Sequence, residues 1–445
     1  MKKYLISAIA VAAIGSTCNA ADDLSTMFSQ GKASGEIREF TIGRDVKYSD
    51  SSKDYFRSAN AIGGHLKFET DDWNGLSFGT ALYTTNAFLM HEKEDPTLLG
   101  PDNESYSILG EAYVQYKRGN TIFKGGRQKL DTPLAGSDDA RMLPNLFEAY
   151  LLINSDIPGT TLIAGHVTRF AQGTFGRAYG AGGLLGATSG YSAVDASNQV
   201  GDFVNMGSYS VGTHTDGVSV VSATYTGIEN LKVQLWDYYA YDILNAIYGE
   251  ANFSWTCLLS DSVKPFVGVQ VIKENSVGDE LVGNLGGDGK VDSLYWAGKF
   301  GFNVENFSLF GAYSQSTAND NGEPAYSSAT ISPWGGMPAY TQGMVTRHMF
   351  LAGTSAIKVA ATYNWKRFGP DLKTVGYWAS FAMDDNNGYT YDDASETGFD
   401  IIYKPQFVAN LQLRLRGNFT DDFNVNNAGD TVEWNEYRFI VNYKF

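Results

Sequence analysis

Hydrophobic and polar residues alternate one by one in many short stretches of this 445-residue chain. In "ANLQLRLRGNF", Leu411, Leu413 and Leu415 alternate with polar residues, and "GGHLKFET" and "ENLKVQLWDYY" repeat the pattern. A period of two residues is typical of a β-strand that has one apolar and one polar face. The pattern therefore predicts an all-β protein whose strands separate two different environments.

Short and long connections alternate between these stretches. Eight short connections lie at 71–75, 117–120, 154–159, 226–230, 260–262, 303–306, 368–371 and 404–406, and nine long ones lie near 46–60, 84–106, 129–145, 171–215, 239–246, 274–292, 316–355, 383–397 and 420–434. These seventeen connections join eighteen strands, each about ten residues long, which is the length of a tilted strand that crosses a bilayer. We therefore expect a transmembrane antiparallel β-barrel of about 18 strands, with short periplasmic turns and long extracellular loops.

The two ends of the chain support the same interpretation. Residues 1–20 have the features of a signal peptide, with Lys2 and Lys3 before an apolar core and small residues before Ala21. Residues 21–445 are then a single barrel domain. The last stretch, "NEYRFIVNYKF", is itself a strand pattern, and it must pair with the first strand because hydrocarbon tolerates no open sheet edge. We expect Phe445 to face lipid, and this aromatic ending resembles the signal that bacterial outer-membrane assembly machinery recognises.

Composition agrees with a barrel and excludes some partners. The chain has 49 Gly, 27 Tyr and 26 Phe, which suits short strands and interfacial aromatic belts, and we expect Trp236–Tyr239 and Tyr295–Trp296 in such belts. The formal net charge of −16 becomes −18 once Lys2 and Lys3 leave with the signal peptide. Such an acidic chain is not expected to bind nucleic acid.

No motif for catalysis or for a cofactor stands out. The five histidines show no i,i+4 pair, "GNLGGDGKV" lacks two essential residues of a phosphate-binding loop, and no G-x-S-x-G motif occurs. The acidic stretch 383–396 has Met383 where a calcium loop needs aspartate. We therefore expect neither an enzyme nor a resident metal, and we read this stretch as a hydrated loop that divalent ions could bridge to lipopolysaccharide.

One longer motif carries a family resemblance. The segment 125–152 contains Gly126-Arg127-Gln128, Thr132-Pro133 and Asp139-Ala140-Arg141-Met142-Leu143-Pro144. This run resembles the OprD family of outer-membrane porins. The resemblance implies an eighteen-stranded barrel whose third and seventh loops narrow the lumen, and whose wall carries a row of basic residues for carboxylate-bearing substrates. The Gly-rich insert at 171–215, with Leu184-Leu185, and the long loop 316–355 depart from the family pattern and leave the pore width open.

The resemblance and the alternation together name candidate residues for the pore constriction. An arginine presents a permanently charged planar fork that can hold a carboxylate through two hydrogen bonds. The cationic candidates are Arg141 in the third-loop motif, Arg127 just before it, and Arg414, Arg416 and Arg438 on inward strand faces. Arg347 and Arg367 are further candidates, in a stretch whose strand register the sequence leaves open. The acidic candidates, which would hold a cationic part of the substrate, are Asp138, Asp139 and Asp131.

The expected function is passive diffusion through the bacterial outer membrane. The solutes are small and polar, and the basic row favours those that bear a carboxylate, such as amino acids and organic acids. Outer-membrane lipid and lipopolysaccharide would surround the barrel. Two alternatives stay open: a general, poorly selective porin that could assemble as a homotrimer, and a surface adhesin for which the barrel is only an anchor.

Overall fold

The computed structural model describes residues 21–89, 94–179, 182–196 and 198–445. The signal peptide, residues 1–20, lies outside them and stays a prediction. Within the described residues, eighteen strands have eight or more residues: β1 (Lys32–Tyr48), β2 (Tyr55–Glu69), β3 (Leu76–Ala87), β4 (Tyr106–Arg118), β5 (Thr121–Gln128), β6 (Leu146–Asn154), β7 (Thr160–Ala171), β9 (Val218–Tyr225), β10 (Leu231–Ala240), β11 (Leu244–Ser254), β12 (Val263–Ser276), β13 (Asp292–Val304), β14 (Phe307–Ser316), β15 (Ser355–Asn364), β16 (Asp371–Ala382), β17 (Ala394–Lys404), β18 (Leu411–Asp421) and β20 (Thr431–Lys444).

The remaining elements are short and lie mostly in the connections. They are the two-residue strands β8 (Val204–Asn205) and β19 (Asn424–Val425), the helices α1 (Leu24–Ser29), α2 (Gly183–Thr188) and α3 (Met206–Val211), and the 3-10 helices η1 (Ser51–Lys53), η2 (Pro101–Asn103), η3 (Thr174–Tyr179), η4 (Leu281–Leu285), η5 (His348–Phe350) and η6 (Trp365–Phe368). In the described part of the chain, no helix is long and apolar enough to cross a membrane.

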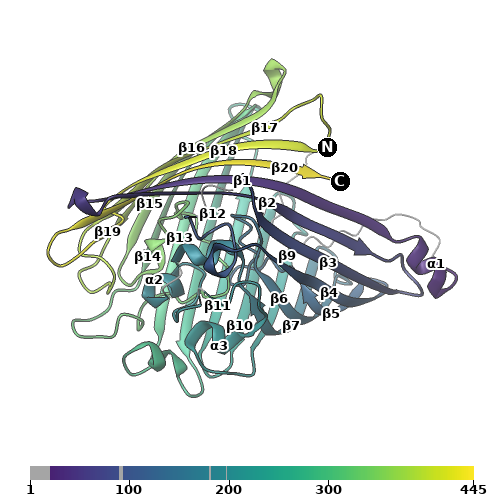
Figure 1. The fold of residues 1–445 in the computed structure, drawn as a ribbon, viewed down its shortest axis with the longest axis horizontal. Helices are drawn as coiled ribbons and strands as arrows, with labels where there is room; N and C mark the ends of the chain where they lie inside the picture. The colour runs from purple at the N-terminus through teal and green to yellow at the C-terminus, as the bar shows by residue number, and fades with distance from the viewer. Residues whose placement is uncertain (1–20, 90–93, 180–181, 197) are drawn as a thin grey trace.

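The eighteen long strands form one closed antiparallel barrel (Figure 1). Closure comes from β1 and β20, which pair from Glu36 opposite Lys444 to Tyr48 opposite Val432. This pairing leaves no open edge, so every strand of the wall has two neighbours. The predicted eighteen-stranded barrel is thereby confirmed.

The connections alternate in length as expected, with two differences. The loop expected at 46–60 is only 49–54, and the loop expected at 239–246 is only 241–243. The strands continue further than the apolar pattern indicates, because outward-facing positions near the loop ends, such as Asp45 and Asn245, are polar. Apolar alternation therefore marks where a strand crosses hydrocarbon rather than where it ends.

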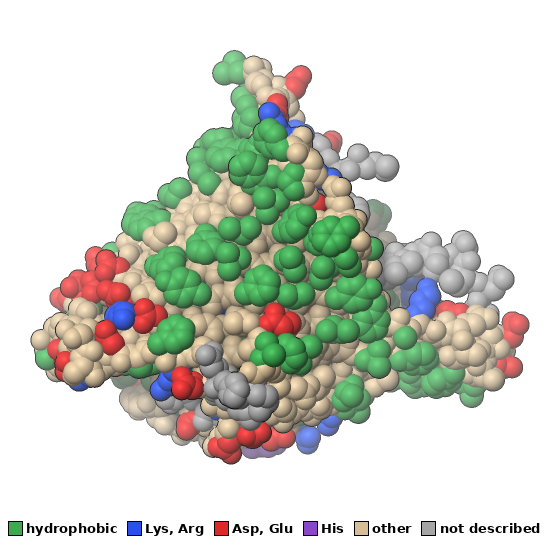
Figure 2. Space-filling view, turned by 45° about the horizontal axis from the view of Figure 1, so that its top comes forward, with side chains coloured by type: hydrophobic (Ala, Val, Ile, Leu, Met, Phe, Trp, Pro, Cys, Tyr) green, Lys and Arg blue, Asp and Glu red, His purple; other side chains and the backbone are tan. Residues whose placement is uncertain are grey.

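The last strand shows how the two faces of the wall differ. Phe439 and Tyr443 on β20 are exposed on the outer face, while Arg438 and Asn442 point inward and are buried. Phe445 continues the outer face, stacks against Tyr443, and its backbone N–H and C=O both pair with Gly35. Figure 2 shows hydrophobic side chains spread over this side of the barrel. The recognition of Phe445 by assembly machinery stays a prediction.

The aromatic belt prediction is only half right. Tyr239 and Trp296 are exposed on the outer face, but Trp236, Tyr238 and Tyr295 point inward and are at most 5% exposed. Side chains alternate along each strand, so adjacent aromatics cannot all face the same side. The inward members belong to the core.

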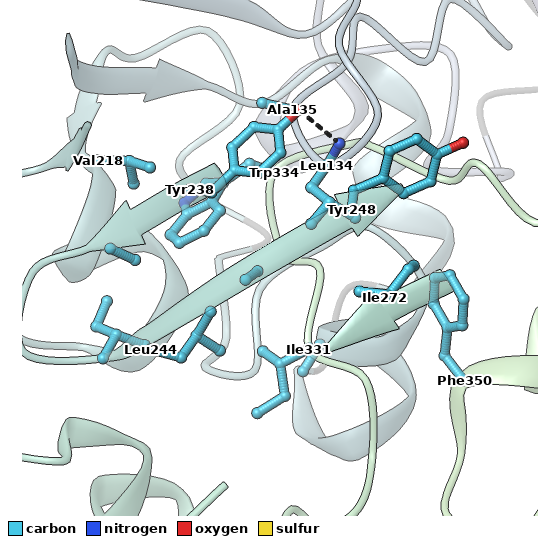
Figure 3. Packing of buried hydrophobic residues seen from close by; sticks show 14 of the residues in the cluster. Leu134, Ala135, Val218, Tyr238, Leu244, Tyr248, Ile272, Ile331, Trp334 and Phe350 are labelled. Carbon is cyan, nitrogen blue, oxygen red and sulfur yellow. Dashed lines mark hydrogen bonds between the residues drawn. The ribbon is translucent and has the colours of Figure 1, made fainter. Parts of the chain in front are cut away.

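An apolar core fills the loop end of the barrel on one side. Figure 3 shows Leu134, Ile331 and Trp334 from two long loops packed on inward side chains of β10–β12, including Tyr238 and Ile272. The Tyr238 hydroxyl lies 3.4 Å from the backbone nitrogen of Leu134, which donates to it. Leu184 of α2, in the Gly-rich insert, is buried in the same cluster. The long loops thus fold into the barrel and are held there by hydrophobic burial.

Candidate functional site: the constriction

The third long loop, L3 (129–145), is tied to the first strand of the wall. Arg38 on β1 donates from Nη1 to Asp139 Oδ1 at 2.6 Å and to the backbone oxygen of Arg141 at 2.5 Å. Lys129 approaches the same carboxylate at 3.3 Å. Burial on its own would raise the pKa of the Asp139 carboxyl, but the charges of Arg38 and Lys129 hold it well below its ordinary value. Asp139 is therefore a fixed negative charge between two cations.

A single carboxylate on β20 holds a buried group of arginines. Glu436 Oε2 accepts from Arg141 Nη2 at 2.7 Å and from Arg438 Nε at 2.7 Å, and Oε1 accepts from Arg44 Nε at 3.1 Å. Arg141 and Glu436 side chains are both 0% exposed. Burial and the neighbouring Arg438 lower the pKa of Arg141 to about 10, which leaves it charged at neutral pH, and Glu436 opposes the shift. Arg141 thus anchors L3 to the wall through a fully buried ion pair and is itself not exposed to water.

The seventh long loop, L7 (317–354), runs along the inner side of the wall from β12 to β17. Inward-facing side chains hold it in chain order, each through a hydrogen bond to the loop backbone or to a loop hydroxyl. The contacts are Glu274 on β12 with the Ile331 N–H, Gln270 on β12 with the Tyr340 N–H, Ser314 on β14 with the Thr341 hydroxyl, Lys358 on β15 with the Gln342 carbonyl, Tyr377 on β16 with the Met344 N–H, and Glu396 on β17 with the N–H groups of Met344, Val345 and Thr346. L7 therefore lines this part of the wall as an inner belt.

L3 and L7 meet inside the barrel at two points. At the first, the Gly136 N–H donates to the Trp334 carbonyl at 3.0 Å, and Gly335 has a φ of +80° with its α-carbon so near Gly136 that a Cβ would lie 2.3 Å from the Gly136 oxygen. Glycine is needed there on both counts. At the second, Arg347 Nη1 lies 2.9 Å from Asp138 Oδ2. The two loops therefore form one continuous partition.

The fourth long loop (172–217) closes around the second junction. The Tyr191 hydroxyl donates to Asp138 Oδ2 at 2.7 Å, and Arg347 donates to the Ser189 carbonyl at 2.7 Å while its guanidinium lies over the Phe175 ring. Burial alone would lower the pKa of Arg347, but the Asp138 carboxylate raises it above its ordinary value. Asp138 and Arg347 are thus a buried structural joint of three loops.

Two arginines on β18 are partly exposed, beside buried charges on β17, β20 and β1. The side chains of Arg414 and Arg416 are 29% and 17% exposed, and both make their ion pairs with Asp400 on β17. Arg416 stands opposite Arg438 in the β18–β20 register, and Arg38 on β1 donates from Nε to Asn442 on β20 at 2.9 Å. We call Arg414, Arg416, Arg438 and Arg38 the arginine row. The row crosses three adjacent strands beside the loop partition.

Three inward lysines have an aromatic neighbour and a similar setting. The ammonium groups of Lys124, Lys299 and Lys358 lie 3.7, 3.8 and 4.5 Å from the ring centroids of Tyr113, Tyr340 and Tyr377, respectively. A cation over an aromatic face is stabilised without a carboxylate partner. These lysines add positive charge to the lumen. The sequence signal that could have located them is the alternation of side chains along their strands, which places each of them on the inner face.

The other predicted residues lie elsewhere. Arg127 shares the outer face of β5 with the exposed Phe123, pairs across the strands with Glu148, and its guanidinium lies over Phe203 of the fourth loop. This outer position differs from the pore-facing role that the motif implies. Asp131 accepts from the Ser137 N–H and hydroxyl and so shapes L3 internally. Arg367 lies at a short turn, half exposed and paired with Glu305 at 3.0 Å.

Comparisons with known proteins agree with this architecture. A family model described as outer membrane porin, OprD family, matches residues 83–445. Similar solved structures include OccK9 (OpdG) of Pseudomonas aeruginosa, with 19% identity, a TM-score of 0.74, and coverage of 94% of this chain and 99% of that chain. OpdK of the same organism, solved with vanillate, has 14% identity, a TM-score of 0.70, and coverage of 93% and 98%.

A third solved structure, OccK8 (OprE) of Pseudomonas aeruginosa, has 16% identity, a TM-score of 0.70, and coverage of 94% of this chain and 99% of that chain. No curated protein sequence matches this chain. The family match extends over most of the residues and the shared fold is an outer-membrane barrel. The chain therefore belongs to the OprD family of outer membrane porins and lies in the bacterial outer membrane.

Proposed function

We propose that this porin preferentially admits small solutes that bear a carboxylate, such as amino acids and organic acids. The observation that carries the proposal is the pair Arg414 and Arg416. Both side chains are partly exposed and, among the described residues, both form their ion pair with the same carboxylate, Asp400. Two guanidinium groups on one carboxylate leave donor capacity for an anionic solute. An arginine whose N–H groups were all paired within the protein would have no donor left for a solute.

The spacing suits a stepwise passage. Arg414 and Arg416 are two residues apart on one strand face, so their α-carbons are about 7 Å apart along the strand. A carboxylate can bind Arg416 first and then Arg414, which lies nearer the short-turn end of β18. The second arginine is close enough to take over the carboxylate as it leaves the first. Each contact must be weak enough for release, and the charge of Asp400 keeps it so.

One of the similar solved structures supports this choice of solute. OpdK was solved with vanillate, which is a carboxylate. At 14% identity that structure shares the fold with this chain, and we extend the ligand class to this chain as part of the proposal. The partly exposed Arg414 and Arg416 and the inward lysines supply the positive surface that such a solute requires.

The test is solute flux through the double variant Arg414→Gln/Arg416→Gln in proteoliposomes. Removing charge-assisted hydrogen bonds of about 1.5–3 kcal/mol each should reduce the flux of butyrate about tenfold or more, while a neutral solute of similar size passes unchanged. Arg367→Gln is the matched control, because this arginine lies at a short turn and pairs with Glu305.

Two outcomes would contradict the proposal. An equal change in anionic and neutral flux would mean that the arginines affect only the pore size, as in a general porin. A planar bilayer without discrete conductance steps would favour the adhesin. Whether the protein forms a homotrimer stays a prediction, and cross-linking in native membranes would measure it.

A further inference from the structure

The turn 343–346 of L7 is held by an unusual acceptor. Glu396 on β17 accepts three successive backbone N–H groups: Met344 at 2.5 Å through Oε1, and Val345 at 3.1 Å and Thr346 at 2.7 Å through Oε2. The Tyr377 hydroxyl donates to the same carboxylate. Successive N–H groups that converge on one point form a concave anion-binding site, and here the anion is a side chain of the barrel wall.

The local sequence is adapted to this contact. A Cβ at Gly343 would lie 2.8 Å from Glu396 Oε2 and 2.8 Å from the Thr346 oxygen, which is closer than a real Cβ contact. Glycine at 343 therefore leaves the space that the carboxylate occupies. Glu396 itself is 0% exposed, so water does not compete for its oxygens.

The same turn touches the arginine row and the other loops. Arg438 Nη1 lies 3.8 Å from Met344 Sδ, and the Tyr179 hydroxyl of the fourth loop donates to the Val345 carbonyl at 2.7 Å. Arg347, the next residue, forms the joint with Asp138 of L3. The position of this turn thus decides how closely the loop partition approaches the arginine row.

We propose that Glu396 is a positioning residue that sets the width of the constriction by holding the turn 343–346 beside the arginine row. The inference rests on the proposed function only in taking the space beside that row as the path of the solute. Both carboxylate oxygens are essential to the role, because an amide accepts through one atom only and cannot receive the N–H of Met344 together with those of Val345 and Thr346. Loss of the second acceptor oxygen frees the turn, so that Met344 can move away from Arg438 and the constriction widens.

The test compares Glu396→Gln with Glu274→Gln in planar bilayers. Glu274 is also buried and accepts the Ile331 N–H at 2.8 Å, but it holds a part of L7 beside β12, away from the turn 343–346. Glu396→Gln should raise the single-channel conductance about twofold and admit larger neutral polyethylene glycols, because the narrowest section limits both. Glu274→Gln should leave the size limit unchanged.

A second variant guards against misfolding. Gly343→Ala keeps the carboxylate but places a methyl group against it, so it should displace the turn and produce the same wider pore. Resistance of the unheated barrel to SDS shows that each variant is folded. An unchanged polyethylene glycol limit in both folded variants, or the same widening in Glu274→Gln, would overturn the proposal.

The readout separates this inference from the proposed function. The size limit for neutral polymers does not depend on any preference for carboxylates. If Arg414→Gln/Arg416→Gln left butyrate flux intact while Glu396→Gln widened the pore, the carboxylate preference would fail and the role of Glu396 would stand. If Arg414→Gln/Arg416→Gln reduced butyrate flux while Glu396→Gln left the pore width unchanged, the role of Glu396 would fail and the carboxylate preference would stand.

Discussion

Two parts of the inner wall hold the long loops by different physical means. The apolar wall, at the loop end of β6–β13, presents side chains such as Tyr238, Leu244 and Ile272 to Leu134 and Trp334 of the loops. The charged wall, on β17, β18, β20 and β1, holds them through carboxylates and arginines, with Glu436 as its centre. Both walls belong to one sheet with the same alternation of side chains.

The difference shows where a porin can place each kind of contact. Hydrophobic burial is non-directional and excludes water, so the apolar side chains of this wall fill space, and the hydrogen bonds to L7 there come from Glu274 and Gln270 on β12. Ion pairs need defined geometry, and a partly hydrated one such as Arg414–Asp400 keeps polar groups available at a water surface. Loop support and water-exposed ion pairs therefore coincide on the charged wall, whereas the apolar side chains offer support alone.

The largest effect is expected on the charged wall, from Glu436→Gln. The change leaves Arg44, Arg141 and Arg438 without their shared carboxylate in a buried site, and breaking such a pair costs about 3–5 kcal/mol. Urea unfolding in detergent, followed by tryptophan fluorescence, measures the loss. Glu433→Gln, on the outer face of the same strand, should change the unfolding free energy by less than about 0.5 kcal/mol. Equal losses in the two variants would contradict the central role of Glu436.

A somewhat smaller effect is expected on the apolar wall, from Leu134→Ala. This L3 side chain is 3% exposed, and removal of such a buried group costs about 2–5 kcal/mol through lost burial and a cavity. The ratio of anionic to neutral flux should stay the same, because no charge changes. Leu66→Ala, which truncates an exposed leucine of the outer face, is the control. A shift of the flux ratio in Leu134→Ala would show that the two walls are not separate.

The smallest effect is a pH dependence at His348, where L7 meets the ninth loop. Its Nε2 lies 2.7 Å from the Phe423 carbonyl, which can only accept, so the ring donates there, and burial lowers the pKa of His348 to about 4. The rings of Phe381, Tyr389 and Phe423 surround it, and burial raises the pKa of Tyr389, which stays neutral.

The sign follows from the two pKa values of His348. The pKa of His348 in the folded state lies below the ordinary 6.5. The contribution of the neutral ring to the free energy of unfolding is therefore complete above pH 6.5 and is lost as the pH falls through about 4. The loss is at most about 3 kcal/mol. Unfolding at pH 7.5 and pH 4 measures it, and His348→Gln, which keeps a donor but does not titrate, should have a flatter profile. Parallel profiles would assign the acid sensitivity to other groups.

Errors in the placement of single residues arose where a motif, for Arg127, or an expected aromatic belt, for Trp236, was followed instead of strand parity. Counting by twos from the exposed Phe123 assigns Arg127 to the outer face, and counting from Lys232 assigns Trp236 to the inner face. Both signals are present in the sequence. The lysines over tyrosine rings and the inward Arg38 could have been found in the same way, because they lie on regular strands.

Other features had no signal in the local sequence. Arg141 and Arg347 are polar residues of long loops, and nothing nearby in the chain indicates that both are buried. Their partners, Glu436 and Asp138, are 295 and 209 residues away in sequence. Such contacts depend on how the loops fold back into the barrel, which a periodic pattern does not describe.

By itself, the sequence determined the eighteen-stranded barrel, the side of the short turns and the inner face of most strands. It could do so because a strand between lipid and water must alternate, and because hydrocarbon forbids open edges. Only the tertiary structure decided which inward charges stay exposed, like Arg414, and which, like Arg141, are covered. That outcome depends on the packing of L3, L7 and the fourth loop against the wall, and packing is a property of residues distant in sequence.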